Sequence, residues 1–211
     1  MREFTVLLAT RNKGKVKELA ALLADTPISV IDLTGFPELE LEETGETFEE
    51  NARIKAITAA KHTGFFSLAD DSGLEVDALA GQPGVRSARF AHETATDEEN
   101  NTLLLARLEG VPSERRTARF VSVVALASPD GVCVSRTGVA EGLIGTSPRG
   151  NGGFGYDPLF YVPEHGATYA EIPTELKNCI SHRARAFLAI KEEIVKYLLG
   201  GQTFDSAACH K

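Results

Sequence analysis

The sequence predicts an α/β protein with a mixed, mostly parallel sheet that is flanked by helices. Short apolar runs, typical of buried strands, alternate with helical patterns over residues 4–69. Strands joined by a helix pair in parallel, which predicts the parallel part of the sheet. Two runs rich in β-branched residues, 117–127 and 132–140, flank Pro129-Asp130-Gly131, which predicts a hairpin. We expect this hairpin to form a second lobe.

Three strands and two helices are expected in the first third of the chain. Residues 4–9 form the first strand, and a helix with apolar residues at helical spacing follows and ends before Pro27. The second strand covers residues 28–33. Thr47 and Glu50 have capping-box spacing and open a helix of about four turns. The third strand then ends at Asp70.

The remaining elements follow from similar signals. Thr96 and Glu99 form a second capping box at the start of another helix. A glycine-dense loop at 149–157 precedes a short strand at 159–162, and the last helix begins near Ser181. Since no repeat, low-complexity tract or clear linker interrupts the pattern, we expect one two-lobed domain. It covers residues 1–201, and residues 202–211 form a flexible tail.

Composition narrows the classes of partner. The chain has 211 residues, of which 43% are hydrophobic and 25% charged, as in ordinary globular proteins. Its 22 Lys and Arg against 30 Asp and Glu give a formal net charge of −8. A nucleic-acid polymer requires a broad basic face, so we expect no such partner.

Other counts bear on location and metal type. No apolar run approaches a membrane span and the N-terminus lacks a signal-peptide core, so no membrane partner is expected. Cys133, Cys179 and Cys209 fit neither a disulfide framework nor a zinc site, which favours a reducing cytoplasm. The five histidines lack metal-ligand spacing, so any metal is a hard, oxygen-liganded ion.

The most informative segment is Leu-Ala-Asp-Asp-Ser-Gly at residues 68–73. An apolar run ends there in two adjacent carboxylates, and strand ends open onto the crevices where α/β proteins bind ligands. Two neighbouring negative charges repel and need a divalent cation, a basic partner or a proton. A solvated turn is the alternative, because Asp, Ser and Gly are ordinary turn residues.

A second candidate is the strand-to-helix junction at residues 10–15, Thr-Arg-Asn-Lys-Gly-Lys. Backbone N–H groups at a helix N-terminus, with Thr and Asn side chains, form an anion pocket, and Lys13 and Lys15 add positive charge. The spacing of a Walker A loop is absent. A capped, lysine-rich surface turn is an equally good interpretation of this segment alone.

An acidic stretch over residues 38–50 supplies further carboxylates. Most are expected to be solvated, although one could reach a metal held by the aspartates. Asn51 and Lys55 are four residues apart and share one helix face. A solvent-facing polar pair is the alternative for these two residues.

The glycine-rich loop at residues 152–158 is the third candidate. Its glycines allow the backbone to pass close to a ligand, and Phe154 could stack on a planar base. A tight turn whose Phe packs into the core is the alternative.

Lys177 and the Ser181-His182-Arg183 run form the fourth candidate. Ser181 is a good N-cap, which places two cations in a first helical turn, where they oppose the helix dipole.

Taken together, the ordered motifs resemble one family. They are Thr10-Arg11-Asn12-Lys13-Gly14-Lys15, residues 43–52, residues 69–76, residues 83–90, Gly153 to Asp157, Lys177-Asn178 and Ser181-His182-Arg183. This pattern resembles the inosine/xanthosine triphosphate pyrophosphatase family, which removes non-standard purine nucleotides. The resemblance covers nearly the whole chain, up to Gly201, and implies a central nucleotide cleft.

The resemblance implies hydrolysis of ITP, dITP and XTP to the monophosphate and pyrophosphate, with Mg²⁺ and as a homodimer. It implies that Glu42 and Asp71 bind the metal and that Asp71 is also the general base. A sharing of these two roles between Asp70 and Asp71 is the alternative. The implied substrate-binding residues are Thr10, Arg11, Asn12, Lys13, Gly14 and Lys15, with Lys55, for the triphosphate, and Ser72, Phe154, Gly155, Tyr156, Asp157, Lys177, His182 and Arg183 for the nucleotide pocket.

Selectivity has a simple chemical basis in this reading. Inosine and xanthosine carry a 6-keto acceptor where adenosine carries an amino donor, and Arg183 only donates. Sites built on such bonds can discriminate by ~10⁴ or more. Two alternatives stay open: a pyrophosphatase for a pyrimidine or another modified nucleotide, and a nucleotide-binding sensor without turnover.

Overall fold

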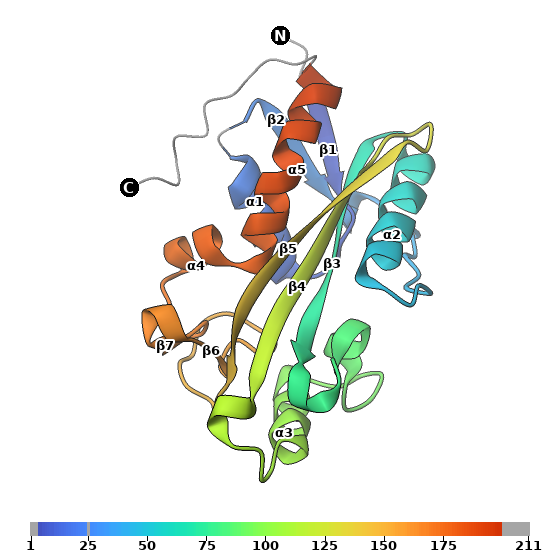
Figure 1. Ribbon diagram of the computed structural model, residues 1–211. Coiled ribbons are helices and arrows are strands. Elements are labelled where there is room, and N and C mark those ends of the chain that lie inside the picture. Colours follow the sequence, from blue (N-terminus) through green and yellow to red (C-terminus); the bar gives the residue numbers. More distant parts are fainter. Residues whose placement is uncertain (1–3, 25, 200–211) are drawn as a thin grey trace. The chain divides into compact units, whose positions relative to one another are not determined.

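The computed structural model describes residues 4–24 and 26–199 (Figure 1). Its helices and strands are β1 (Phe4–Leu8), α1 (Lys13–Leu23), β2 (Ile28–Asp32), α2 (Phe48–Thr63), β3 (Phe66–Val76), α3 (Asp97–Arg107), β4 (Thr117–Ala127), β5 (Cys133–Ile144), β6 (Phe160–Val162), β7 (Ala167–Thr168), α4 (Thr174–Ile180) and α5 (His182–Leu199). The predicted tail at 202–211 lies outside the described residues. Within those residues, no helix has the length and apolarity needed to cross a membrane.

In the described part of the chain, seven strands form one sheet in the order β2-β1-β3-β4-β5-β6-β7. β1 pairs in parallel with β2 and β3, whereas β6 pairs antiparallel with β5 and β7. β4 and β5 are neighbours joined by a link too short for a crossover, so they are also antiparallel. The sheet is mixed, as predicted, but it is mostly antiparallel rather than mostly parallel. Helical connections, which make strands parallel, dominate only the N-terminal part.

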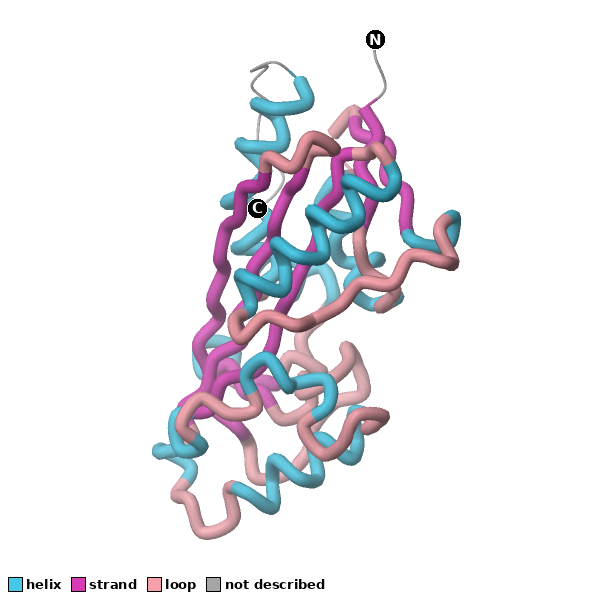
Figure 2. Tube along the Cα trace, turned by 90° about the vertical axis from the view of Figure 1, so that its right-hand side faces the viewer, coloured by secondary structure: helices cyan, strands magenta, loops and turns pink. Residues whose placement is uncertain are grey.

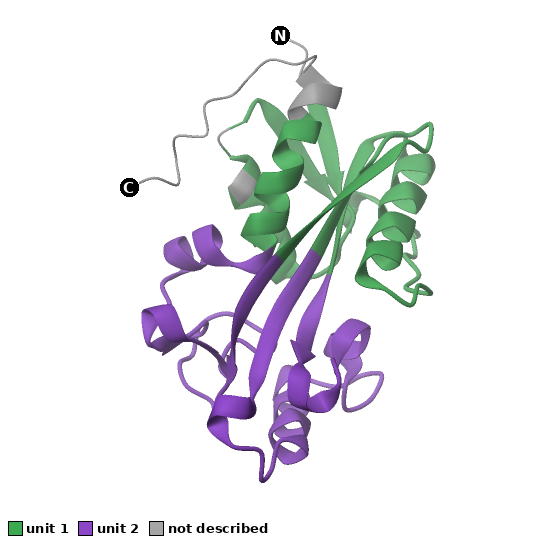
Figure 3. Cartoon of the chain, in the orientation of Figure 1, with its two compact units in different colours: residues 1–71, 123–138, 183–211 green, residues 72–122, 139–182 purple. Residues whose placement is uncertain are grey.

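The chain divides into two compact units (Figure 3). Unit 1 comprises residues 1–71, 123–138 and 183–211, and unit 2 comprises residues 72–122 and 139–182. The predicted hairpin is present as β4 and β5, but it is not a lobe of its own, because its tip belongs to unit 1. Unit 2 instead combines two segments that are distant in sequence, residues 72–122 and 139–182, and no local sequence pattern predicts that they pack together. The central cleft stays a prediction.

Unit 1 has its own apolar core. It is built by β1, β3 and β4 and by the inner faces of α1 and α5, with residues such as Val6, Leu19, Leu68, Phe187 and Ile190 fully buried. In this unit α2 lies on one face of the strands, and α1 and α5 lie on the other (Figure 2). The two faces of β3 therefore meet different helices.

Unit 2 has a separate core that is rich in aromatic rings. The Phe120 ring stacks against Tyr169 at 5.9 Å between centroids and against His182 at 4.6 Å, and it also contacts Phe160 at 4.6 Å. Leu104 of α3 is fully buried in the same cluster. This packing fixes the elements from which the glycine-rich loop emerges.

Local signals set several boundaries correctly. Thr47 and Thr96 are the N-caps of α2 and α3, and each forms a reciprocal capping box with the Glu three residues later. The last helix, α5, begins at His182, directly after Ser181, as predicted. Ser181 has extended backbone and is also the C-cap of α4, an element that the sequence did not reveal. β3 does not end at Asp70 but continues to Val76.

Candidate active site

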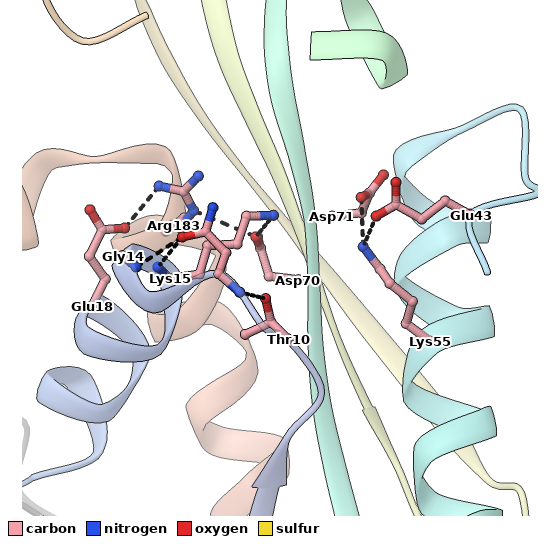
Figure 4. Close-up of polar contacts among 10 residues, drawn as sticks. Thr10, Gly14, Lys15, Glu18, Glu43, Lys55, Asp70, Asp71 and Arg183 are labelled. Carbon is pink, nitrogen blue, oxygen red and sulfur yellow. Dashed lines mark hydrogen bonds and ion pairs between the residues drawn. The ribbon is translucent and has the colours of Figure 1, made fainter. Parts of the chain in front are cut away.

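Asp70 and Asp71 lie in the interior of β3 and not at its end. Successive side chains of a strand point to opposite faces, so the two carboxylates do not converge on one point. Figure 4 shows Asp70 on the side of α1 and Asp71 on the side of α2. The expected repulsion between neighbouring charges is thus avoided, because each carboxylate has its own cationic partner.

Asp70 joins a buried group of charges on the face covered by α1 and α5. Lys15 Nζ lies 2.7 Å from Asp70 Oδ2, and Arg183 Nε lies 3.5 Å from the same oxygen (Figure 4). Arg183 Nη1 also donates to Glu18 Oε2 at 2.8 Å. The side chain of Asp70 is fully buried. A buried carboxylate between two cations orients both of them, since leaving it unpaired would be costly.

The junction at residues 10–15 forms the start of α1, as predicted. Asn12 is the N-cap, and its side-chain oxygen accepts from the N–H groups of Gly14 and Lys15 at 2.9 and 3.2 Å. Thr10 Oγ1 accepts from the Asn12 N–H at 3.2 Å. Lys15 is thereby held beside the positive end of the helix, where an anion binds favourably.

Arg11 uses its side chain differently from the other residues of this junction. Its Nη2 atom donates to the carbonyl oxygens of Phe36, Pro37 and Leu39 at 3.1, 3.1 and 2.9 Å. The guanidinium therefore fastens the junction to the segment that leads into the acidic stretch. Although Arg11 was expected to hold the triphosphate, its guanidinium binds backbone carbonyl oxygens of the protein itself.

Asp71 meets Lys55 and Glu43 on the opposite face of β3. Lys55 Nζ lies 2.7 Å from Asp71 Oδ1 and 2.8 Å from Glu43 Oε1 (Figure 4). Burial opposes the positive charge, but the two carboxylates outweigh it and raise the pKa of Lys55 above its ordinary value. Burial also raises the pKa of the Asp71 carboxyl, although Lys55 acts in the opposite direction.

The contacts around Lys55 suit a hard cation. A compact ammonium is already bound between two carboxylate oxygens, and carboxylates are the ligands that Mg²⁺ prefers. Among the described residues, no group of three or more His, Cys, Asp or Glu could hold a metal ion by itself. Mg²⁺ tolerates this, because it keeps waters and takes substrate phosphates as ligands. Glu43 contacts Lys55, and both Glu43 and the expected metal ligand Glu42 are exposed.

Unit 2 carries a second group of candidate site residues. Asp157 Oδ2 accepts from Lys177 Nζ at 2.6 Å and from the Phe154 N–H at 2.9 Å. The ammonium of Lys177 also lies 5.1 Å from the centre of the Phe154 ring. Lys177 and Asp157 are both buried. A Cβ at Gly153 would collide with the Asp157 carboxylate, so glycine is required there.

Other expected pocket residues have structural contacts. The Tyr156 hydroxyl is buried and donates to the carbonyl oxygen of Ser87 at 2.8 Å, and burial, reinforced by the charge of Asp97, raises its pKa. His182 stacks on Phe120, as described above. Ser72 is half-buried in β3. Tyr156 thus anchors the loop from inside the core.

The predicted residues of unit 1 thus form two separate groups, Lys15 and Arg183 around Asp70 on one face of β3, and Lys55 with Asp71 on the other face. Unit 2 brings together Phe154 to Asp157 with Lys177. Sequence reasoning missed two contacts. Glu18 follows Lys15 by three residues on α1, a spacing that places it on the same helix face. Glu43 was seen only as one of several acidic residues.

Comparisons with known proteins identify the same pattern. A model of the Ham1 family matches residues 6–193. A dITP/XTP pyrophosphatase of Geobacter sulfurreducens is 55% identical over 190 residues, which cover 90% of this chain and 96% of that protein. One from Desulforamulus reducens is 56% identical over 182 residues, covering 86% and 90%.

Solved structures agree. A HAM1 protein from Coxiella burnetii superposes with a TM-score of 0.84 at 44% identity and covers 92% of this chain and 99% of its own. A nucleoside-triphosphatase, dITP/XTP pyrophosphatase, from Mycobacterium abscessus gives a TM-score of 0.73 at 46% identity, covering 89% and 98%. The match extends over both units.

Proposed function

Because this chain belongs to the Ham1 family, we propose that it hydrolyses non-standard purine nucleoside triphosphates, namely dITP, ITP and XTP. The products are the monophosphate and pyrophosphate. The observation that carries the proposal is the pair of cation-bound carboxylates on β3, which stands beside an anion-binding helix start in unit 1. Under this proposal the protein is a nucleoside-triphosphate pyrophosphatase that removes non-standard nucleotides from the cellular nucleotide pool.

The phosphates would be held by the junction at residues 10–15 and by two lysines. Lys15 and Lys55 each present an ammonium next to an aspartate, and the N–H groups at the start of α1 add a positive dipole. These fixed charges would stabilise the negative charge that develops on the phosphoryl group. Their anchoring by buried carboxylates supports the assignment.

Asp71 is our choice for the general base. Its carboxyl is buried and its pKa is raised, which strengthens it as a proton acceptor for the attacking water. As the proton passes from water to Asp71, the water oxygen forms a bond to the attacked phosphorus, one P–O bond of the bridge between the α- and β-phosphates breaks, and the monophosphate and pyrophosphate separate. Asp70 is bound to Lys15 and Arg183 on the other face, which supports a positioning role for Asp70.

We also propose that the enzyme uses Mg²⁺. Asp71, with Glu42 as the resemblance implies or with the adjacent Glu43, would hold the ion. When bound, Mg²⁺ neutralises phosphate charge and polarises the phosphoryl oxygens. The remaining proposals are a homodimer, as the resemblance implies, and a cytoplasmic location, which the cysteine usage supports.

Phe154, Asp157 and Lys177 of unit 2 would recognise the base, and the resemblance implies the same role for Arg183 of unit 1. Phe154 offers a stacking face, and the Lys177–Asp157 pair offers a donor and an acceptor. Glu18 and Asp70 fix the guanidinium of Arg183, which would donate to a 6-keto oxygen. An adenine amino group would face a donor there and be rejected.

The test is pyrophosphate release from a panel of nucleotides with and without Mg²⁺. We expect dITP and XTP to be cleaved far faster than ATP or GTP, and Asp71→Asn to reduce kcat by at least ~10². Glu164→Gln, which changes an exposed carboxylate, is the matched control. Equal turnover of all triphosphates, or a fully active Asp71→Asn, would refute the proposal.

A further inference from the structure

Helix α3 holds the glycine-rich loop at a single residue, Gly155. The Gly155 N–H donates to Asp97 Oδ2 at 2.6 Å, and Asn101 Nδ2 donates to the Gly155 carbonyl oxygen at 3.0 Å. Both polar groups of this residue are therefore bound by one helix. Gly155 directly follows Phe154, and two residues later comes Asp157. Any movement of Gly155 would displace both groups that we assign to base recognition.

The geometry of α3 suits this contact. Asp97 and Asn101 are four residues apart and so lie on one face of the helix. Asp97 is not needed as the helix cap, because Thr96 and Glu99 already form a capping box. The Asp97 carboxylate is thus committed to the loop, where it accepts a charge-assisted hydrogen bond.

Asn101 shows that the contact does not serve stability alone. Its side chain is 8% exposed, and its Oδ1 atom is buried with no hydrogen-bond partner among the described residues. A buried acceptor without a partner destabilises the folded state, so an apolar residue of similar size would suit this position better. The retained amide makes one visible contact, the bond to Gly155.

From these observations we propose that Asp97 and Asn101 are positioning residues for nucleobase recognition. They fix the Gly155 peptide groups, so that Phe154 keeps its stacking face and Asp157 keeps the geometry in which it binds Lys177 and the Phe154 N–H. This role rests on the proposed function, because it requires the loop to contact the base. Under this proposal α3 contributes to the choice of base and does not contact the phosphates.

The decisive variant is Asn101→Leu, measured with dITP, XTP and the base-free probe tripolyphosphate. We expect KM for dITP to rise about fivefold, which matches the loss of one hydrogen bond. The inhibition constant of tripolyphosphate should stay unchanged, because that probe lacks a base. The melting temperature should be unchanged or higher, since the unpaired buried oxygen is removed.

A second pair of variants tests the other contact. Asp97→Ala removes the acceptor for the Gly155 N–H and should raise KM for dITP by a similar factor. Asp97→Asn keeps an acceptor oxygen at this position, so its KM for dITP should stay close to that of the wild type. Glu98→Ala is the matched control, because it removes a charge from the same helical turn and its side chain is exposed. Hydrogen exchange of the Phe154 and Gly155 amides should accelerate in Asp97→Ala but not in the control Glu98→Ala.

Three outcomes overturn the inference. KM for dITP could stay unchanged in both Asn101→Leu and Asp97→Ala, the tripolyphosphate constant could rise together with KM, or the loop amides could exchange as slowly as in the wild type. If the wild-type protein cleaves neither dITP nor XTP, the proposed function itself fails. The exchange data would then still show whether α3 clamps the loop.

Discussion

At the scale of single residues, the environment of Asp71 decides its chemistry. Lys55 links Asp71 to Glu43, and its ammonium occupies the position between two oxygens that a divalent ion would favour. The same lysine would also bind phosphate. Metal and Lys55 should therefore compete for the carboxylates, and release of Lys55 toward the substrate would follow from metal binding.

Lys55→Met tests this competition. Without nucleotide, we expect Mg²⁺ to raise the melting temperature of Lys55→Met more than that of the wild type, because no ammonium competes for the two carboxylates. The variant should lose at least about a hundredfold in kcat/KM, as expected when a charge that stabilises the transition state is removed. Thermal melts with and without Mg²⁺ measure the first effect, and Lys55→Met/Asp71→Asn should abolish the gain. An equal gain in wild type and Lys55→Met would contradict the model.

Tyr156 provides a pH test of its buried hydroxyl. Because burial raises its pKa, the folded protein keeps the phenolic proton above pH 10 while the unfolded chain releases it. The unfolded state then binds fewer protons, so the free energy of unfolding falls as the pH rises through the ordinary value of 10. Urea unfolding at pH 8 and pH 10.5 should show a smaller alkaline loss in Tyr156→Phe than in the wild type. A loss of the same size in both proteins would exclude Tyr156 as its source.

At the scale of elements, β3 and the glycine-rich loop position their side chains in different ways. β3 uses strand alternation to send Asp70 and Asp71 to separate faces, each toward its own lysine. The loop uses close approach of its backbone to a carboxylate: Gly153 passes Asp157 where a side chain would not fit. Both arrangements depend on backbone geometry rather than on the catalytic groups themselves.

A glycine pair isolates the effect of that close approach. Gly153 and Gly155 both have positive φ values, 73° and 62°, so alanine is strained at either position by roughly 1 kcal/mol. At Gly155 a Cβ would meet nothing within 4 Å, whereas at Gly153 it would displace the Asp157 carboxylate. We expect Gly153→Ala to lose base selectivity, with a ratio of dITP to dATP turnover at least about tenfold lower. Gly155→Ala should keep most of it, and equal ratios would contradict this account.

At the scale of the whole molecule, we propose that the two units carry different functions. Unit 1 holds the cations and carboxylates suited to the triphosphate, and unit 2 holds the aromatic loop with its buried Lys177–Asp157 pair. Each unit has its own core, so each can fix its groups independently. Phosphate binding and base choice should therefore respond to different substitutions.

Lys15→Ala and Lys177→Ala should separate these two functions. Lys15→Ala removes a phosphate contact and should weaken both dITP and tripolyphosphate by about tenfold, as expected when a hydrogen bond to a charged group is lost. Lys177→Ala should weaken dITP by a similar factor and leave tripolyphosphate binding unchanged. Inhibition constants and KM values measured side by side are the readout. Loss of tripolyphosphate binding in Lys177→Ala would mean that the work is not divided in this way.

Local patterns were reliable where the physics is local. The capping boxes at Thr47 and Thr96 satisfy helix N–H groups within four residues, so their spacing alone located two helix starts. The bounds of β4 were predicted correctly because its β-branched run is continuous. The extent of β3 was not, since Asp, Ser and Gly resemble a turn until neighbouring strands bind their backbone.

The candidate site residues, from Thr10 to Arg183, come from ordered motifs, and their roles stay predictions. The contacts of Glu18 and Glu43 and the bonds of Arg11 to backbone carbonyls became visible only in the packed structure. Contacts between residues distant in sequence leave no periodic signal, so spacing could not reveal them.

By itself the chain's order of amino acids determined the starts of helices α2, α3 and α5, the α/β class and the family. Only tertiary packing decided that the two aspartates face apart and that α3 grips the loop at Gly155. The physical reason is that hydrogen bonds and apolar periodicity act over a few residues, whereas the pairing of buried charges depends on which elements the fold brings together.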